Sequence, residues 1–168
     1  IRDRDWSLDL QVSYELGDDG LTVTPSATNV GTTVAPFGFG AHPYLTAGEE
    51  TVDELTLSLP GATVLDVDDR LIPTGRSTVP TELDFREARP IGATELDHAF
   101  TDLVAEGGRW AVSVSRGEVT ATLWGEASAY PFVQVFTGDS LPADKARRSG
   151  VAVEPMTCPA NAFATGDS

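Results

Sequence analysis

The sequence predicts an all-β protein, specifically an antiparallel β-sandwich in which two sheets pack face to face. Three observations predict this class. Apolar residues alternate with polar ones along much of the chain, Gly- and Pro-rich connections separate the alternating stretches, and almost no stretch has a helical period. Because a period of two places neighbouring side chains on opposite faces of a strand, each stretch has one face to bury.

Residues 6–16, WSLDLQVSYEL, are the first alternating stretch and predict a long half-buried strand. The turn GDDG at residues 17–20 leads into a second strand over residues 21–30. The start of the chain therefore predicts a hairpin. The apolar positions of its first strand are Trp6, Leu8, Leu10, Val12, Tyr14 and Leu16.

Further alternating stretches predict strands along the rest of the chain. The one passable helix is a turn or two within residues 142–150, where Pro142 suits a first helical position and Gly150 can end the helix. Because no internal repeat or linker-like stretch is present, we expect a single β-sandwich domain over residues 1–168. The predicted strands are LTLSLP at 55–60, the hairpin RWAVSVSRGEVTATLW at 109–124, FVQVFTG at 132–138 and GVAVEP at 150–155.

The composition narrows the possible functions. A net charge of −15 argues against binding nucleic acid or an anionic membrane surface, because both need basic patches. The apolar runs are only a handful of residues long, so no membrane span is expected. Cys158 is the single cysteine, which excludes an internal disulfide and favours the cytoplasm. Two histidines and one cysteine do not favour a zinc site.

Glu154 interrupts the apolar stretch GVAVEP immediately before Pro155. Burying an unpaired carboxylate costs free energy, so Glu154 must be solvated, paired with another group or used in binding or catalysis. Proline holds the preceding residue extended, which gives Glu154 a fixed backbone at the end of a strand. Two interpretations stay open from this stretch alone. Glu154 is either a residue on the solvent-exposed face of an edge strand or a positioned general base.

His42 lies in the Gly-rich stretch APFGFGAHPYLTAG, between Ala41 and Pro43. Histidine is the side chain whose ordinary pKa lies near neutrality, so it can serve as an acid or a base. The ordinary alternative is a histidine packed in a loop with both ring nitrogens satisfied.

Asp97 and Gln134 are two further candidates. Asp97 precedes His98 in an extended segment, so their side chains point to opposite faces. An inward Asp97 suits sugar hydroxyls, because an ionised carboxylate only accepts hydrogen bonds. A capping or loop-closing aspartate is the ordinary alternative. Gln134 shares a strand face with Phe132 and Phe136, where a lone amide needs a ligand or a backbone group to bind.

Four stretches, taken together and in order, resemble the aldose 1-epimerase (galactose mutarotase) family. The resemblance covers most of the chain, and HPYL with EPMTCP is most similar to a bacterial branch of related epimerases. It implies the family's large antiparallel β-sandwich, of which this chain is similar to the C-terminal portion. The four stretches are NVGTTVAPFGFGAHPYL, LDFREARPIG…LDHAF, FVQVFTGDSL and GVAVEPMTCPANAF.

The resemblance also implies a role for each candidate residue. His42 matches the family's general acid and Glu154 its general base. Asp97 matches an aspartate that binds sugar hydroxyls, and Gln134 matches a glutamine that contacts the substrate. The implied reaction interconverts the α and β anomers of an aldohexose such as galactose or glucose through the open-chain aldehyde. It needs no metal and no cofactor.

One departure from the family concerns length. Family members are about twice as long, and their upstream half carries an Arg and a second His that contact the sugar and have no counterpart here. The chain opens on IRDRD without a Met, which predicts a fragment or a processed chain whose upstream half is a candidate partner. A non-catalytic carbohydrate-binding sandwich and a sugar-phosphate epimerase stay open as alternatives. The latter needs converging basic residues, and only Arg147 and Arg148 cluster.

Overall fold

The computed structural model describes residues 6–48, 51–143 and 147–166. The chain divides into two compact units, Ile1–Phe37 and Gly38–Ser168. The first is a hairpin, and the second contains two antiparallel sheets. This division does not test whether the two units fold together, so a single domain over residues 1–168 stays a prediction.

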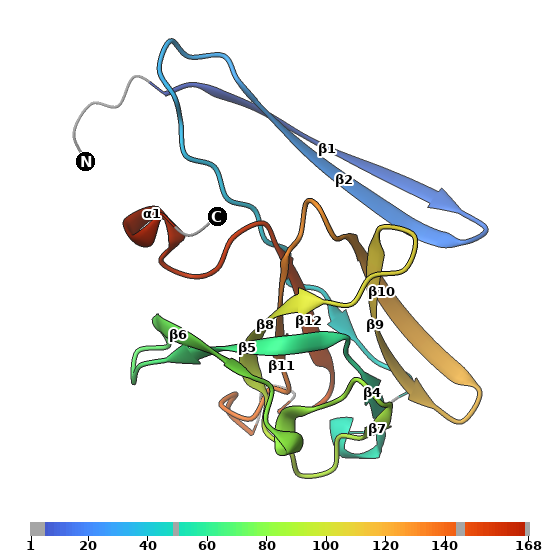
Figure 1. Cartoon of the computed structure of the whole chain (residues 1–168). Coiled ribbons are helices and arrows are strands. Elements are labelled where there is room, and N and C mark those ends of the chain that lie inside the picture. Colours follow the sequence, from blue (N-terminus) through green and yellow to red (C-terminus); the bar gives the residue numbers. More distant parts are fainter. Residues whose placement is uncertain (1–5, 49–50, 144–146, 167–168) are drawn as a thin grey trace. The chain divides into compact units, whose positions relative to one another are not determined.

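The first unit is one antiparallel hairpin, β1 (Leu8–Gly17) and β2 (Gly20–Asn29), as the sequence predicts (Figure 1). Residues 18–19 form a two-residue turn between the strands. The prediction that the first strand is half-buried is wrong, because Tyr14 is 69% exposed and Leu16 is 84% exposed. The physical reason is that a two-stranded sheet has no second layer of its own to cover an apolar face.

The second unit contains a six-stranded and a four-stranded sheet, and neighbouring strands in both are antiparallel (Figure 1). Many neighbours are not consecutive, so segments far apart in the sequence lie side by side. The six-stranded sheet has the order β3 (Tyr44–Leu45), β12 (Val151–Met156), β11 (Phe132–Phe136), β8 (Asp97–Leu103), β5 (Gly61–Val67) and β6 (Pro73–Thr78). The four-stranded sheet has the order β10 (Val119–Glu126), β9 (Arg109–Arg116), β4 (Thr56–Ser58) and β7 (Arg89–Pro90).

The apolar core of the second unit lies between these two sheets. Alternate residues of each central strand face it and are buried, so one cluster joins both sheets. The antiparallel β-sandwich that the alternation predicts is therefore confirmed. The opposite face of the six-stranded sheet is left to carry the polar residues of the candidate site. Central members of the cluster are Trp110, Val112 and Val114 on β9, Val133 and Val135 on β11, and Val151 and Val153 on β12.

The helical elements are short and differ from the prediction. The helix predicted over residues 142–150 is wrong in its described part, because Arg148 has a φ of 53°, in the left-handed region that a helix cannot continue through. Residues 144–146 lie outside the described residues. No helix in the described part of the chain is long and apolar enough to cross a membrane. The elements present are α1 (Ala162–Thr165) and 3₁₀ turns at Val52–Glu54 and Thr81–Leu83.

Candidate active site

The candidate residues lie in a row on one face of the six-stranded sheet. Glu154 on β12 is directly opposite Gln134 on β11. Asp97 on β8 is directly opposite Phe136, two residues beyond Gln134 on the same face. The row therefore crosses three neighbouring strands, on the face turned away from the core.

Glu154 follows three fully buried residues, Val151–Val153, and precedes Pro155. Its strand lies between β3 and β11, so it is not the edge strand that one of the two interpretations required. The Glu154 side chain is only 18% exposed. Burial raises its pKa above the ordinary value, the nearby His42 opposes this rise, and the like charge of Asp97 adds to it.

His42 is held against β12 by the backbone on both sides of it. The Ala41 N–H donates to the carbonyl of Pro155 at 3.3 Å, and the Pro43 carbonyl accepts from the Val153 N–H at 3.0 Å. The His42 side chain is 53% exposed, and its Nε2 lies 3.0 Å from Oε1 of Glu154. It is therefore not a histidine packed away in a loop. It is an exposed imidazole in contact with the carboxylate.

Gln134 and Asp97 are joined by a hydrogen bond. The Nε2 of Gln134 donates to Oδ1 of Asp97 at 2.7 Å. His98 is opposite Val135 and so belongs to the other face, and its Nδ1 accepts the N–H of Asp97 at 3.1 Å. Burial lowers the pKa of His98, although Asp97 opposes this, so its imidazole is neutral at pH 7.

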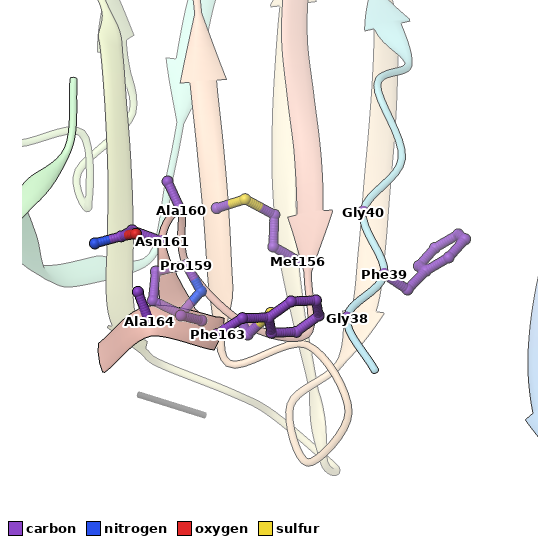
Figure 2. A pocket seen from close by; sticks show the side chains of 11 residues that line it. Gly38, Phe39, Gly40, Met156, Pro159, Ala160, Asn161, Phe163 and Ala164 are labelled. Atoms are coloured by element: carbon purple, nitrogen blue, oxygen red, sulfur yellow. The ribbon is translucent and has the colours of Figure 1, made fainter. Parts of the chain in front are cut away.

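A pocket of about 490 Å³ is lined by residues from the segments that flank His42 and Glu154, but by neither of these two residues. Gly40 and Met156, each two residues from a member of the pair, form a bridge between their backbones and line it. Figure 2 shows Gly38 and Gly40 along one side of this pocket and Phe163 of the short helix α1 near Gly38. A Cβ on Gly38 would lie 2.7 Å from the Sγ of Cys158, so any larger residue there would have to displace the thiol.

A second pocket, of about 360 Å³, lies at the other end of the row, where Asp97 and Phe136 contribute to its lining. Within the described residues, no group of three or more His, Cys, Asp or Glu side chains could hold a metal ion.

Two contacts at the site were not singled out from the sequence. The Tyr44 ring packs against the His42 ring, with centroids 5.1 Å apart. The Phe39 N–H donates to Oγ1 of Thr157 at 2.8 Å, which ties the segment before His42 to the segment after Glu154. The spacing of two between His42 and Tyr44 was a usable signal, because it places both on one face of an extended segment. Nothing local marks Thr157.

Residues 3–168 match the protein-family model described as aldose 1-epimerase. The chain belongs to the aldose 1-epimerase family. It is 38% identical over 161 residues to the Escherichia coli K12 protein YihR, which is described as uncharacterized; the match covers 93% of this chain and 48% of YihR.

Solved structures agree with this family membership at the level of the fold. A candidate aldose 1-epimerase from Escherichia coli K12 matches with a TM-score of 0.72 and 20% identity, over 94% of this chain and 52% of that one. Galactose 1-epimerase from Lactobacillus acidophilus NCFM matches with a TM-score of 0.68 and 20% identity, over 91% of this chain and 49% of that one. This aldose 1-epimerase family member thus has a galactose mutarotase-like sandwich and spans about half the length of the relatives it matches.

Proposed function

We propose that this protein interconverts the α and β anomers of an aldohexose such as galactose or glucose. Family membership supports an isomerase of this class, and one structural relative is a galactose 1-epimerase. The single observation that carries the proposal is the contact of 3.0 Å between Nε2 of His42 and Oε1 of Glu154. It brings together one candidate acid and one candidate base on an accessible sheet face.

The proposed reaction removes one proton from the C1 hydroxyl and supplies one proton to the ring oxygen, and both of these oxygens are bonded to C1. Glu154 accepts the proton of the C1 hydroxyl while His42 protonates the ring oxygen, so the C1–O5 bond breaks and C1 becomes the aldehyde carbon. After rotation about C1–C2, closing the ring reverses both transfers, and each group returns to its starting protonation state. Such positioned proton transfer contributes roughly 10²–10⁴-fold per group.

The separation of the pair fits this chemistry. The two oxygens that exchange protons are bonded to the same carbon, so the acid and the base must lie close to each other. Nε2 of His42 and Oε1 of Glu154 lie 3.0 Å apart, and in the proposed complex the C1 hydroxyl and the ring oxygen of the sugar replace this direct contact. Gln134 and Asp97, next along the row, offer an amide and a carboxylate to the remaining hydroxyls.

We infer that a second segment, corresponding to the other half of the relatives, completes the sugar clamp. The chain matches 48% of YihR and 49% of the galactose 1-epimerase, which supports this inference. The apolar face of the β1–β2 hairpin is a surface that such a segment could cover. The cytoplasmic location favoured by the single cysteine stays a prediction.

The proposal is tested by polarimetry of freshly dissolved α-galactose and α-glucose. Glu154→Gln keeps the size of the side chain and removes the base, so we expect the rate above the buffer background to fall by about 10²-fold or more. Glu118→Gln, in the turn between β9 and β10, changes the same residue type away from the row and should leave the rate unchanged.

The assay is run on the chain alone and on the chain supplied with a polypeptide matching the other half of its relatives. Activity in the second arm alone supports the inference of a completing segment. Sugar binding without acceleration in both arms would overturn the epimerase and favour a non-catalytic carbohydrate-binding sandwich. Acceleration restricted to a sugar phosphate would favour the sugar-phosphate epimerase instead.

A further inference from the structure

Gln134 lies between two carboxylates, Asp97 and Glu154, on three neighbouring strands of one sheet face. It is directly opposite Glu154 in the β11–β12 register, and its Nε2 donates to Oδ1 of Asp97 at 2.7 Å. A hydrogen bond to an ionised carboxylate is stronger than one between neutral groups, so it restrains the acceptor. Asp97 therefore holds a negative charge in a fixed position on the same sheet face as Glu154, two strands away.

We propose that Gln134 holds Asp97 on the sheet face that it shares with Glu154, and that the negative charge of Asp97 makes Glu154 a stronger base for the C1 hydroxyl. This inference rests on the proposed function, because base strength matters only if Glu154 accepts a proton. It gives Asp97 an electrostatic task in addition to binding hydroxyls. Gln134 becomes a positioning residue that acts through Asp97.

The charged groups around Glu154 come from both sides of β12. The segment before β3 contributes His42, and the ring of Tyr44 packs against the His42 ring. On the other side, β11 (FVQVF) contains no titratable side chain, so the next charge in that direction is Asp97 on β8. Arg76 on β6 is a positive charge farther across the sheet. Its guanidinium carbon lies 5.5 Å from the centroid of the Phe132 ring on β11.

The pKa of Glu154 agrees with this arrangement. Burial is the largest cause of its rise, His42 acts in the opposite direction, and Asp97 raises it further. His98, the neighbour of Asp97, faces the other side of the sheet and is neutral, so it does not cancel the charge of Asp97. Asp97 is the negatively charged group that raises the pKa of Glu154, so removing its charge isolates the effect.

The first experiment measures Glu154 directly, without any substrate. Protein labelled with ¹³C at the glutamate side-chain carboxyls is titrated by NMR, and Glu154→Gln assigns the resonance. Asp97→Asn keeps the shape of the side chain and an oxygen that can accept from Gln134, but removes the charge. We expect the Glu154 midpoint to move to lower pH. An unchanged midpoint would overturn the inference.

Asp102→Asn is the matched control. Asp102 lies on the same strand, β8, but accepts from Oγ1 of Thr63 at 2.6 Å and not from the row. It should leave the Glu154 midpoint in place. An equal shift with this variant would mean that the effect is one of net charge and would overturn the specific role of Asp97.

The role of Gln134 is tested with a double-mutant cycle. Gln134→Ala keeps the charge of Asp97 but removes the hydrogen bond that holds its carboxylate. We therefore expect the Glu154 midpoint to move in the same direction as with Asp97→Asn, by a smaller amount. The double variant should shift the midpoint no further than Asp97→Asn alone, because Gln134 acts through Asp97. A larger shift in the double variant would contradict the positioning role. Circular dichroism confirms that each variant is folded.

The activity arm separates this inference from the proposed function. In active protein, Asp97→Asn should move the acidic limb of the kcat profile to lower pH and lower the plateau by less than the ~10²-fold loss of a whole base. If Asp97 only binds a sugar hydroxyl, Asp97→Asn should raise KM and leave the acidic limb of the kcat profile at the same pH. A shifted NMR midpoint in a protein that never accelerates mutarotation would refute the proposed function and not the electrostatic effect.

Discussion

Under the proposed function, Glu154 meets opposing demands from stability and from chemistry. Its side chain is only 18% exposed, and burial raises its pKa despite the neighbouring His42. The ionised form that a base needs is therefore the form that folding disfavours. Residues with this property are concentrated at active sites, where the structure tolerates a local cost to obtain a reactive group.

The cost at Glu154 predicts a pH-dependent gain in stability for Glu154→Gln. A carboxyl whose pKa is raised in the folded state adds stability below its ordinary value of 4.5, and this is lost as the pH rises through the folded pKa. The variant, which resembles the protonated form, should match the wild type near pH 4.5 and exceed it in free energy of unfolding at pH 7–8. Urea denaturation across this range measures the difference.

The exposed Glu118→Gln is the control for that experiment. It changes the same formal charge at a turn, so its effect on the free energy of unfolding should be small and should not grow with pH. If Glu154→Gln is less stable than the wild type at pH 8, the contact with His42 outweighs the burial cost and the explanation is wrong.

At the scale of elements, β9 and β10 depend on one glycine. Gly125 on β10 is directly opposite Trp110 on β9, and a Cβ at Gly125 would lie 2.5 Å from the indole ring. Trp110 is 1% exposed, and its Nε1 donates to the Tyr130 carbonyl at 2.7 Å. Burial and this hydrogen bond therefore both hold the indole ring in its position.

We expect Gly125→Ala to lower the free energy of unfolding by about 1–3 kcal/mol through overpacking. Urea titration followed by tryptophan fluorescence measures the loss. Gly17→Ala is the matched control, because no heavy atom lies within 4 Å of its added Cβ and its φ is not positive. Equal midpoints for Gly125→Ala and the wild type would show that β10 relaxes freely around the ring.

At the scale of the second unit, Arg148 joins segments that are far apart in the sequence. Its guanidinium donates to Asp53 at 2.6 Å, to Asp139 at 2.6 Å and to the carbonyl of Gly92 at 2.7 Å, and its side chain is only 14% exposed. Burial raises the pKa of Asp139, but hydrogen bonds from Thr137 and Arg148 outweigh it and lower the pKa overall. The ionised pair therefore stabilises the folded state.

Arg148→Lys should lower the free energy of unfolding by about 2 kcal/mol. The planar guanidinium of Arg148 reaches three acceptors in different directions, which the compact ammonium group of a lysine cannot do. The wild type should also lose stability as the pH falls below the ordinary Asp139 value of 3.8, through its lowered folded pKa, and the variant should lose less. Chemical denaturation at pH 7 and pH 3.5 measures both effects. Arg70→Lys, on the exposed β5–β6 connection, is the control and should change neither.

The sequence determined the strands and the class of fold, because a period of two is a local property that any strand with one buried face must show. It predicted the hairpins and the sandwich. It did not predict β5 or β6, where apolar and polar residues do not alternate, and of β8 it placed only Asp97 and His98 in an extended segment. It also placed a helix where Arg148 turns into the left-handed region. Whether a predicted apolar face is buried depends on a second layer, which is why the β1 prediction was wrong.

The candidate residues could be found in the sequence, but their arrangement could not. Only strand order and register bring Glu154 beside Gln134, and only the backbone bonds around His42 bring its imidazole to the carboxylate. These are contacts between segments distant in the chain, and no local pattern encodes them. The tertiary structure alone decided which charges face one another, because electrostatic energy depends on distance through space and not on separation along the sequence.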